Sequence, residues 1–346
     1  MAGPGSPPVR PASGPRGGGT ATCHVVSHDR WIAQTMLQAL PSDTTWNLVW
    51  HDGLAPTPDL DQGDALWIDP GLLIARNAWL ESLGHPPLEL MAPPADWLTL
   101  LDKDLLGRDV MVSRVGEIRL WREPPDSLGI DPWSQVAGGR VPEFRAARRS
   151  LDQLQGDLAP APDDSLIQIS RHVDGIDQEW RVVVLDGRAV ASSGYCRHAG
   201  PEGRDIITVF DGATFDQSLR TSAERTAVIA ADRGGIDAVC LDLAFLNPTA
   251  PGAIHGRMHP IVLEANPAWC CSPYDYGQDG MEGFLAAIAR GRAPGLNGVA
   301  PSMQAPSASD GRMEPPGPDS RMAPYRPDSW MVSQFRNRYR SYWNHR

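Results

Sequence analysis

Two short apolar segments that carry polar side chains constrain the fold of this chain most strongly. Residues 260–267 read Pro-Ile-Val-Leu-Glu-Ala-Asn-Pro, and about twenty residues earlier Asp242 follows the apolar run 238–241. Side chains alternate between the two faces of a strand, so Glu264 and Asn266 project to the same side. If the two segments pair, the three oxygen-bearing side chains meet at one end of a sheet. Such ligands suit Mg2+, which takes few protein carboxylates together with waters and substrate phosphates.

A simpler interpretation of the same residues stays open. Asp242 and Glu264 are then strand-end acids with solvated carboxylates, and Asn266-Pro267 only forms a turn. Spacing alone favours this interpretation slightly, because short motifs match by chance. A second segment of the chain, residues 179–190, reverses that preference.

Residues 179–190 read Glu-Trp-Arg-Val-Val-Val-Leu-Asp-Gly-Arg-Ala-Val, which predicts a β-hairpin. The dipeptide Asp186-Gly187 is a strong signal for a two-residue hairpin turn. An arginine at position 181 of the first strand presents a rigid fork of donors that can bind phosphate. The alternative is a surface arginine paired with Glu179 or Asp186.

The order and spacing of these segments resemble the ATP-grasp fold. The hairpin comes first, then a helix-like segment at 223–233, then Asp242, and then Glu264 and Asn266. The resemblance covers roughly residues 95–292. It implies an α/β and α+β protein with the ATP-grasp architecture, in which two α+β lobes clasp ATP. Such proteins usually carry a small Rossmann-like α/β subdomain before the ATP-binding part.

The resemblance implies roles for individual residues. Asp242, Glu264 and Asn266 would hold Mg2+, whose charge would neutralise the transferred phosphoryl group. Arg181 would be the catalytic arginine that stabilises developing negative charge, and it shares the nucleotide-binding hairpin with Glu179.

The segment 166–170, Leu-Ile-Gln-Ile-Ser, resembles the hinge whose backbone groups pair with the adenine edge. This likeness assigns Gln168 and Ile169 to the ATP site. A plain buried strand explains the same residues equally well, because backbone contacts leave little side-chain signature.

The chain departs from the family pattern at its lysines. Family members usually grip the nucleotide phosphates with two lysines, and the matching stretch here places Gln135 and Arg140 at those positions. Arg140 can still bind phosphate as a fork of donors, whereas Gln135 removes a positive charge. Lys103 is the only lysine among 31 basic residues.

The function implied by the resemblance is ATP- and Mg2+-dependent ligation of a carboxylate to an amine, with ADP and phosphate released. The partners would be a small-molecule or peptide substrate with a carboxylate, and an amine acceptor. A second hypothesis, motivated by Gln135 and the scarcity of lysine, is a non-catalytic nucleotide-binding or scaffolding protein with the same fold. A third, nucleotidyl transfer, would need Lys103 as its nucleophile.

Composition divides the chain into five parts. Residues 1–20 are rich in Pro, Gly and Arg and read as a disordered leader. Residues 21–94 alternate strand-like and helix-like segments, 95–292 cover the ATP-grasp resemblance, and 293–329 read as a Pro/Ser/Gly-rich linker. The basic-aromatic segment 330–346 carries an apolar stripe, which predicts a helix that docks on its own domain or on a partner.

Charge and cysteine content exclude some classes of protein. The net charge of −11 argues against bulk nucleic-acid binding through phosphate contacts. The five cysteines include no C-x-x-C pair, so a reduced, cytoplasmic compartment is the default expectation. No apolar run approaches the ~20 residues that cross a membrane.

Overall fold

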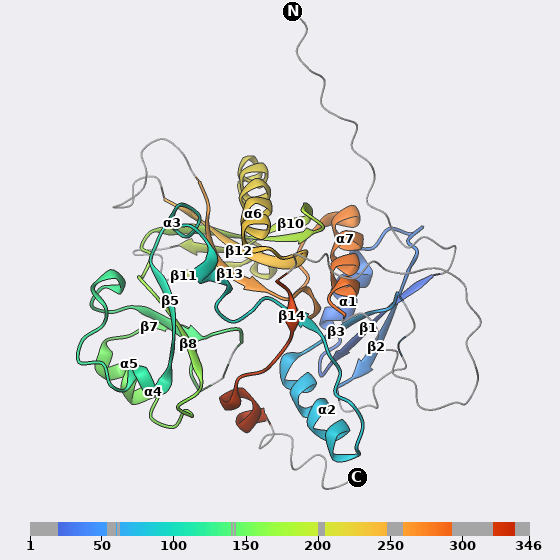
Figure 1. Cartoon of the computed structure of the whole chain (residues 1–346). Coiled ribbons are helices and arrows are strands. Elements are labelled where there is room, and N and C mark those ends of the chain that lie inside the picture. Colours follow the sequence, from blue (N-terminus) through green and yellow to red (C-terminus); the bar gives the residue numbers. More distant parts are fainter. Residues whose placement is uncertain are drawn as a thin grey trace, which may run out of the picture.

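The computed structural model describes residues 20–53, 60, 63–139, 141, 143–199, 205–247, 259–292 and 321–335. These residues form a mixed α/β structure with a parallel sheet near the N-terminus and two larger antiparallel sheets (Figure 1). The strand orders are β2-β1-β3, β5-β8-β6-β7 and β11-β10-β9-β12-β13, and β14 pairs separately with β4.

The N-terminal sheet joins three strands in parallel. Its members are β1 (Ala21–Ser27), β2 (Trp46–Asp52) and β3 (Ala65–Ile68), with helices α1 (Trp31–Ala39) and α2 (Pro70–Ser82). Asp69 begins α2, because its side chain accepts hydrogen bonds from two backbone amides of the first turn. The predicted alternation of strands and helices in residues 21–94 is confirmed, and the comparison of this part with a Rossmann-like subdomain stays a prediction.

The small antiparallel sheet has four strands and is surrounded by short helices. It consists of β5 (Val110–Arg114), β6 (Trp133–Val136), β7 (Ala147–Arg148) and β8 (Leu166–Ser170). The nearby helices are short: η1 (Trp97–Leu100), α3 (Lys103–Leu106), α4 (Val115–Ile118), η2 (Asp126–Leu128) and α5 (Leu151–Asp157). One face of the sheet packs its apolar side chains against residues of α4 and α5.

The large antiparallel sheet is built around the predicted hairpin. Its strands are β9 (Ile176–Leu185), β10 (Arg188–Ala199), β11 (Asp205–Thr208), β12 (Ala238–Leu246) and β13 (Ile261–Asn266). Asp186 and Gly187 both adopt positive φ angles, 48° and 73°, as a two-residue type I′ turn requires. The turn prediction is therefore confirmed.

Alternation along β9 and β12 divides the large sheet between two environments. Val182, Val184 and Leu243 belong to a core that includes residues of α6 (Arg220–Gly234). On the opposite face, Val183 and Cys240 pack in a core with α7 (Gly277–Arg290) and the N-terminal sheet. This second face also carries the polar side chains described below, because they continue the same alternation.

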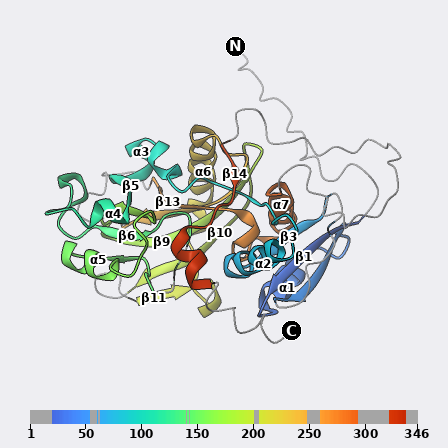
Figure 2. The same ribbon diagram turned by 60° about the horizontal axis from the view of Figure 1, so that its bottom comes forward.

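The described part of the C-terminal segment packs on its own chain. Residues 329–335 are helical, and Trp330 and Met331 are each 1% exposed in the core of the small sheet. Both ribbon views place this helix between the small-sheet lobe and α2 (Figures 1 and 2). Docking of the segment on a partner therefore has no support from these residues; 336–346 lie outside the described part.

The end of the predicted linker is also structured. Strand β14 (Ala323–Pro324) pairs with β4 (Met91–Ala92). The following residues lead from this strand pair to the C-terminal helix 329–335. The earlier part of that linker and the predicted leader 1–19 lie outside the described residues.

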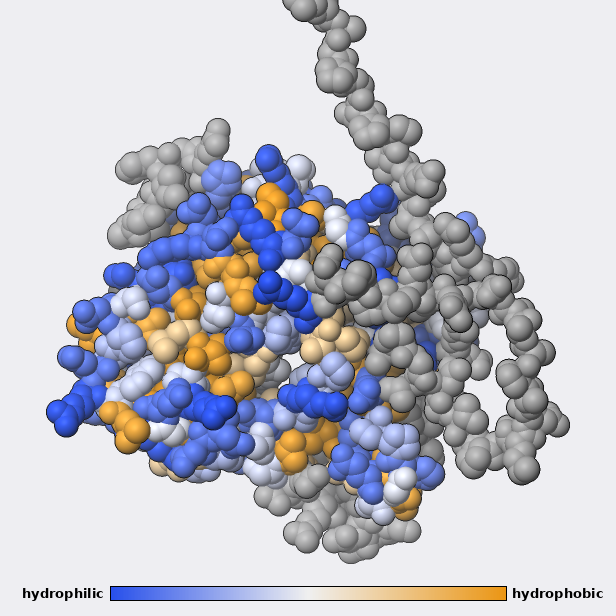
Figure 3. Space-filling model, viewed as in Figure 1, coloured by the Kyte–Doolittle hydropathy of each residue, from blue (hydrophilic) through white to orange (hydrophobic). Residues whose placement is uncertain are grey.

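The face of the molecule seen in Figure 1 carries both hydrophilic and apolar residues. Hydrophilic residues dominate the outer edges of this face, and apolar residues gather in its middle, around β5 and β13 (Figure 3). None of the described helices is long and apolar enough to cross a membrane.

Candidate active site

The three predicted metal ligands lie together on the large sheet. Strands β12 and β13 pair antiparallel, with Asp242 opposite Glu264 and Asn266 opposite Cys240. The Asn266 amide Nδ2 lies 3.2 Å from Asp242 Oδ2 and 3.3 Å from Glu264 Oε2. The predicted pairing of the two strands and the predicted proximity of the three side chains are confirmed, whereas their role as metal ligands stays a prediction.

The cluster lies on a face of the sheet and not at its end. Strand β12 runs from Ala238 to Leu246, so Asp242 occupies its middle. The sequence predicted a strand that ends at Asp242, because a charged residue interrupts the apolar run there. Asp242 is only 3% exposed, and Arg181 on the neighbouring strand compensates its charge.

Arg181 forms a bidentate ion pair with Asp242. The two residues are register partners on β9 and β12, and Arg181 Nε and Nη2 each donate to a carboxylate oxygen at 2.7 Å. Arg181 is 5% exposed, so the predicted phosphate-binding arginine is buried and already paired. The pair uses two of the five N–H donors of the guanidinium.

The electrostatics of Asp242 favour an additional cation. Burial raises the pKa of its carboxyl group, the Arg181 charge opposes this, and the nearby carboxylates of Glu264 and Glu179 raise the pKa further. A divalent ion beside these oxygens would favour the ionised forms. The Asn266 amide nitrogen now lies between the two carboxylates, and a flip of that amide would present its oxygen there instead.

Aromatic side chains cover Arg181. Its guanidinium carbon lies 5.4 Å from the ring centroid of Tyr195 and 5.1 Å from that of Tyr274. These two rings stack on one another with centroids 5.0 Å apart. Phe210 continues the aromatic row at 5.8 Å from Tyr274, and it is 58% exposed. The row therefore leads from the buried ion pair to the surface.

Glu179 belongs to a separate hydrogen-bonded group on the same face. Its Oε2 accepts from the Tyr195 hydroxyl, and its Oε1 lies 2.6 Å from His198 Nε2. The hydrogen bonds to Cys196 and Glu179 raise the pKa of His198 to about 10 although burial opposes this. Glu179 therefore contacts neighbouring side chains that the sequence analysis did not connect with it.

Arg108, which no sequence motif indicated, lies beside this cluster. Its Nη1 donates to the Val262 carbonyl at 2.8 Å and its Nη2 to the Leu263 carbonyl at 3.1 Å. Burial lowers its pKa to about 10, and the charge of Glu264 opposes that shift. Arg108 holds the start of β13 and adds positive charge near Glu264. No local sequence signal marks it, because all its partners are backbone carbonyls, and the two on β13 lie more than a hundred residues away.

Gln135 and Gln168 are brought together on the small sheet. They are register partners on β6 and β8, so their side chains share one face. Val112 and Val110 lie on that face too, and Val110 packs against the core of the large sheet. Gln135 and Gln168 therefore lie on the side of the small sheet turned toward the large sheet.

The proposed adenine hinge does not lie within β8. This strand pairs with both β5 and β6, so the backbone groups of Gln168 and Ile169 are used within the sheet. The Ile169 side chain is fully buried in the opposite core. The assignment of Ile169 to the nucleotide site stays a prediction without a supporting contact, whereas Gln168 turns its side chain toward the large sheet.

For two other candidate residues, Arg140 and Lys103, the structure describes no contact with the cluster. Arg140 lies outside the described residues. Lys103 is an exposed residue at the start of α3, where its Nζ pairs with Asp109 at 2.9 Å. Its surroundings provide no observation in favour of nucleotidyl transfer.

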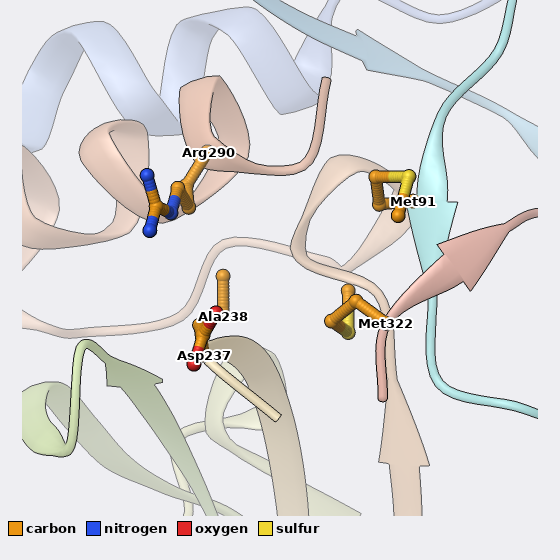
Figure 4. A pocket seen from close by; sticks show the side chains of 5 residues that line it. All are labelled: Met91, Asp237, Ala238, Arg290 and Met322. Carbon is orange, nitrogen blue, oxygen red and sulfur yellow. The ribbon is translucent and has the colours of Figure 1, made fainter. Parts of the chain in front are cut away.

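One small cavity lies away from this cluster. Figure 4 shows Arg290 of α7, Asp237 and Ala238 around the start of β12, and the side chains of Met91 and Met322. Its volume of about 10 Å³ corresponds to a single water molecule. It is too small for a nucleotide or a ligase substrate.

Among solved structures, this chain is similar to ATP-grasp ligases. One is D-alanine–D-alanine ligase from Bacillus anthracis, with 11% identity, a TM-score of 0.45, and coverage of 78% of this chain and 97% of the other. The ADP complex of PurK, N5-carboxyaminoimidazole ribonucleotide synthetase, has 11% identity and a TM-score of 0.43, covering 79% and 78%. The ATP-grasp ligase PsnB, complexed with minimal precursor, Mg and ADP, has 14% identity and a TM-score of 0.39, covering 78% and 97%.

No protein-family model and no curated protein matches the chain. Sequence identities of 11–14% and TM-scores below 0.5 do not establish an activity or a substrate for this chain. Those conclusions depend on the side chains of this chain.

Proposed function

We propose that this chain is an ATP- and Mg2+-dependent ligase that joins a carboxylate to an amine. The observation that carries the proposal is the convergence of Asp242, Glu264 and Asn266 beside Arg181 on one face of the large sheet. Two carboxylates, an amide and an arginine in one place form a site for a metal-bound phosphate and not for an apolar ligand.

The donor set fits Mg2+. Asp242 and Glu264 supply carboxylate oxygens, and Asn266, whose Nδ2 contacts both carboxylates, would supply its amide oxygen after a flip of the amide. When bound, the ion would supply positive charge to the phosphate oxygens of ATP. Half-exposed Glu264 and Asn266 leave the cluster open on the β13 side.

Arg181 would bind and orient phosphate with the donors that Asp242 does not use. A fixed guanidinium needs no reorganisation when negative charge develops, and its stacked tyrosine neighbours exclude water from one side. Arg140 is proposed as the second phosphate-binding cation. Gln135 and Gln168, on the facing side of the small sheet, would contact the nucleotide through neutral hydrogen bonds.

The reaction would take place in two steps. A substrate carboxylate oxygen attacks the γ-phosphorus of ATP, the bond to the β-phosphate oxygen breaks, and ADP leaves. An amine then attacks the acyl phosphate carbon, phosphate leaves, and the nitrogen loses a proton. The residues of this chain bind and orient the two substrates, because phosphoryl transfer depends mainly on positioning and charge stabilisation.

A non-catalytic nucleotide-binding protein is the second candidate function. Gln135 lacks the charge that a phosphate-binding lysine would supply, and Arg181 is paired with Asp242 at 2.7 Å. Mg-ATP binding without turnover on any carboxylate–amine pool would favour this candidate.

ADP release measured across pools of carboxylates and amines separates the two candidates. The proposed ligase sustains ADP release over many turnovers only when both substrates are present, and mass spectrometry detects a new amide. Glu264→Gln should abolish this turnover while the circular dichroism spectrum stays unchanged. The matched control is Glu117→Gln, which changes a carboxylate beside Ser113 in the small-sheet lobe. Turnover close to wild type in the Glu264 variant would contradict the metal assignment.

A further inference from the structure

Glu179, Cys196 and His198 converge on neighbouring strands of the large sheet. Glu179 of β9 is the register partner of Cys196 on β10, and His198 lies two residues further along β10, on the same face. One ligand atom from each residue, an oxygen, a sulfur and a nitrogen, lies within 4.8 Å of the other two. His198 Nε2 and Glu179 Oε1 are 2.6 Å apart.

We propose that these three side chains form a binding site for Zn2+ or a similar thiophilic divalent cation. Thiolate, imidazole and carboxylate are the ligands that Zn2+ uses in proteins, and they differ from the all-oxygen set at Asp242. Three protein ligands leave a fourth position for water or a substrate group, as in zinc sites that are open to chemistry. The site is distinct from the Mg2+ site and needs neither ATP nor Mg2+.

Charge balance supports a divalent ion at this position. A thiolate and a carboxylate together carry two negative charges, and a neutral imidazole adds none. A divalent cation therefore gives a neutral group, which suits partly buried surroundings. Cys196 is 6% exposed, and the side chains of His198 and Glu179 are 18% and 15% exposed.

The surroundings also fix the orientation of one ligand. The Tyr195 hydroxyl donates to Glu179 Oε2, so it holds the carboxylate while Oε1 faces His198. Such hydrogen bonds to metal ligands are common in zinc sites and increase affinity by restricting the ligand. Cys196 takes part in no disulfide, so its sulfur is available as a ligand.

Position links the site to the proposed active centre. Glu179 and Arg181 lie two residues apart on β9 and project to the same face. Tyr195 connects them, since it donates to Glu179 and lies over Arg181. A metal ion held by Glu179 would therefore lie beside the residues proposed to bind phosphate.

The experiment uses the full chain, freed of metal and studied without nucleotide or Mg2+. Zn2+ is titrated against a chromophoric chelator, and Co2+ is added as a spectroscopic probe. We expect one Zn2+ per chain, and a Co2+ complex with thiolate charge-transfer and tetrahedral visible bands. Cys196→Ser should abolish the charge-transfer band, and Tyr195→Phe should weaken Zn2+ binding by about 10–100-fold.

Matched variants separate the site from other cysteines and histidines. Cys270 is half-buried and forms no disulfide, so Cys270→Ser should leave the stoichiometry and the cobalt spectrum unchanged, as should His172→Gln. His198→Gln changes a partly exposed residue and tests the same site if Cys196→Ser does not fold. No binding to the wild type, or wild-type binding in folded Cys196→Ser or His198→Gln, would overturn the proposal. Because ATP and Mg2+ are absent, this result is independent of ligase activity.

Discussion

Arg181 and Asp242 form a two-bond ion pair with both side chains nearly excluded from solvent. Each of the two hydrogen bonds measures 2.7 Å, and the side chains are 7% and 4% exposed. The pair lies in the middle of the large sheet, where β9 and β12 are neighbours. The same two residues therefore stabilise the fold and supply charges to the proposed active site.

Removal of Arg181 should destabilise the protein strongly. Arg181→Met leaves Asp242 as a buried, unpaired carboxylate, which costs about 3–5 kcal/mol of unfolding free energy. Adding Asp242→Asn should restore part of that loss, because the buried charge is then absent. Urea denaturation measures both changes. The control is Arg233→Met, which breaks an exposed pair with Asp102 and should cost less than about 1 kcal/mol.

A lysine at position 135 should strengthen nucleotide binding. Gln135 shares a sheet face with Gln168 on the side turned toward the large sheet, so Gln135→Lys adds a cation at the proposed phosphate position. A hydrogen bond to a charged group contributes about 1.5–3 kcal/mol, which corresponds to at least tenfold tighter binding of ATP. Gln217→Lys adds the same charge at an exposed position and should have no such effect. Equal affinities of the two variants would contradict the placement of the nucleotide.

His198 should make stability depend on pH above neutrality. Its pKa is raised from 6.5 to about 10 by hydrogen bonds to Cys196 and Glu179. A raised pKa in the folded state stabilises the protein fully below the unfolded pKa, and this stabilisation disappears as pH rises through the folded value. The stability of the wild type relative to His198→Gln should therefore fall between about pH 6.5 and 10. Urea titrations with a metal chelator present measure this difference, and a constant difference across that range would be inconsistent with it.

The docked C-terminal helix should contribute to the stability of the whole chain. Trp330 is 1% exposed and packs against Phe144 with ring centroids 5.6 Å apart. Trp330→Ala should cost about 3–5 kcal/mol of unfolding free energy, as large-to-small substitutions of buried aromatic residues do. Trp31→Ala, at a side chain that is 40% exposed, is the control and should cost much less. Equal losses for the two variants would show that the helix does not pack this way in solution.

Local sequence rules predicted the parts of the site that depend on neighbouring residues. The period of two along a strand placed Glu264 and Asn266 on one face, and Asp186-Gly187 predicted the hairpin turn. The same rules ended a strand at Asp242 too early. Both faces of β12 are buried, so an ion pair with a distant arginine permits a charged residue in mid-strand.

The remaining differences come from long-range pairing. Ile169 lies on an inner strand because β5 and β6, which are separated in sequence, pair on either side of β8. Arg108 donates to the backbone carbonyl of Leu106 and to two backbone carbonyls on β13, and carbonyls have no residue-specific signal. Cys196 and Glu179 meet only through the register of the hairpin, which contains a bulge near Gly194. No local pattern encodes such a register shift.

The central claim is that Asp242, Glu264 and Asn266 hold a metal-bound nucleotide. Calorimetric titration with a non-hydrolysable ATP analogue, with and without Mg2+, tests it most directly when the wild type and Glu264→Gln are compared. We expect Mg2+-dependent binding in the wild type, and binding at least tenfold weaker, by about 1.4 kcal/mol, in the variant. Binding that is absent in the wild type, or unaffected by both Mg2+ and the substitution, would contradict it.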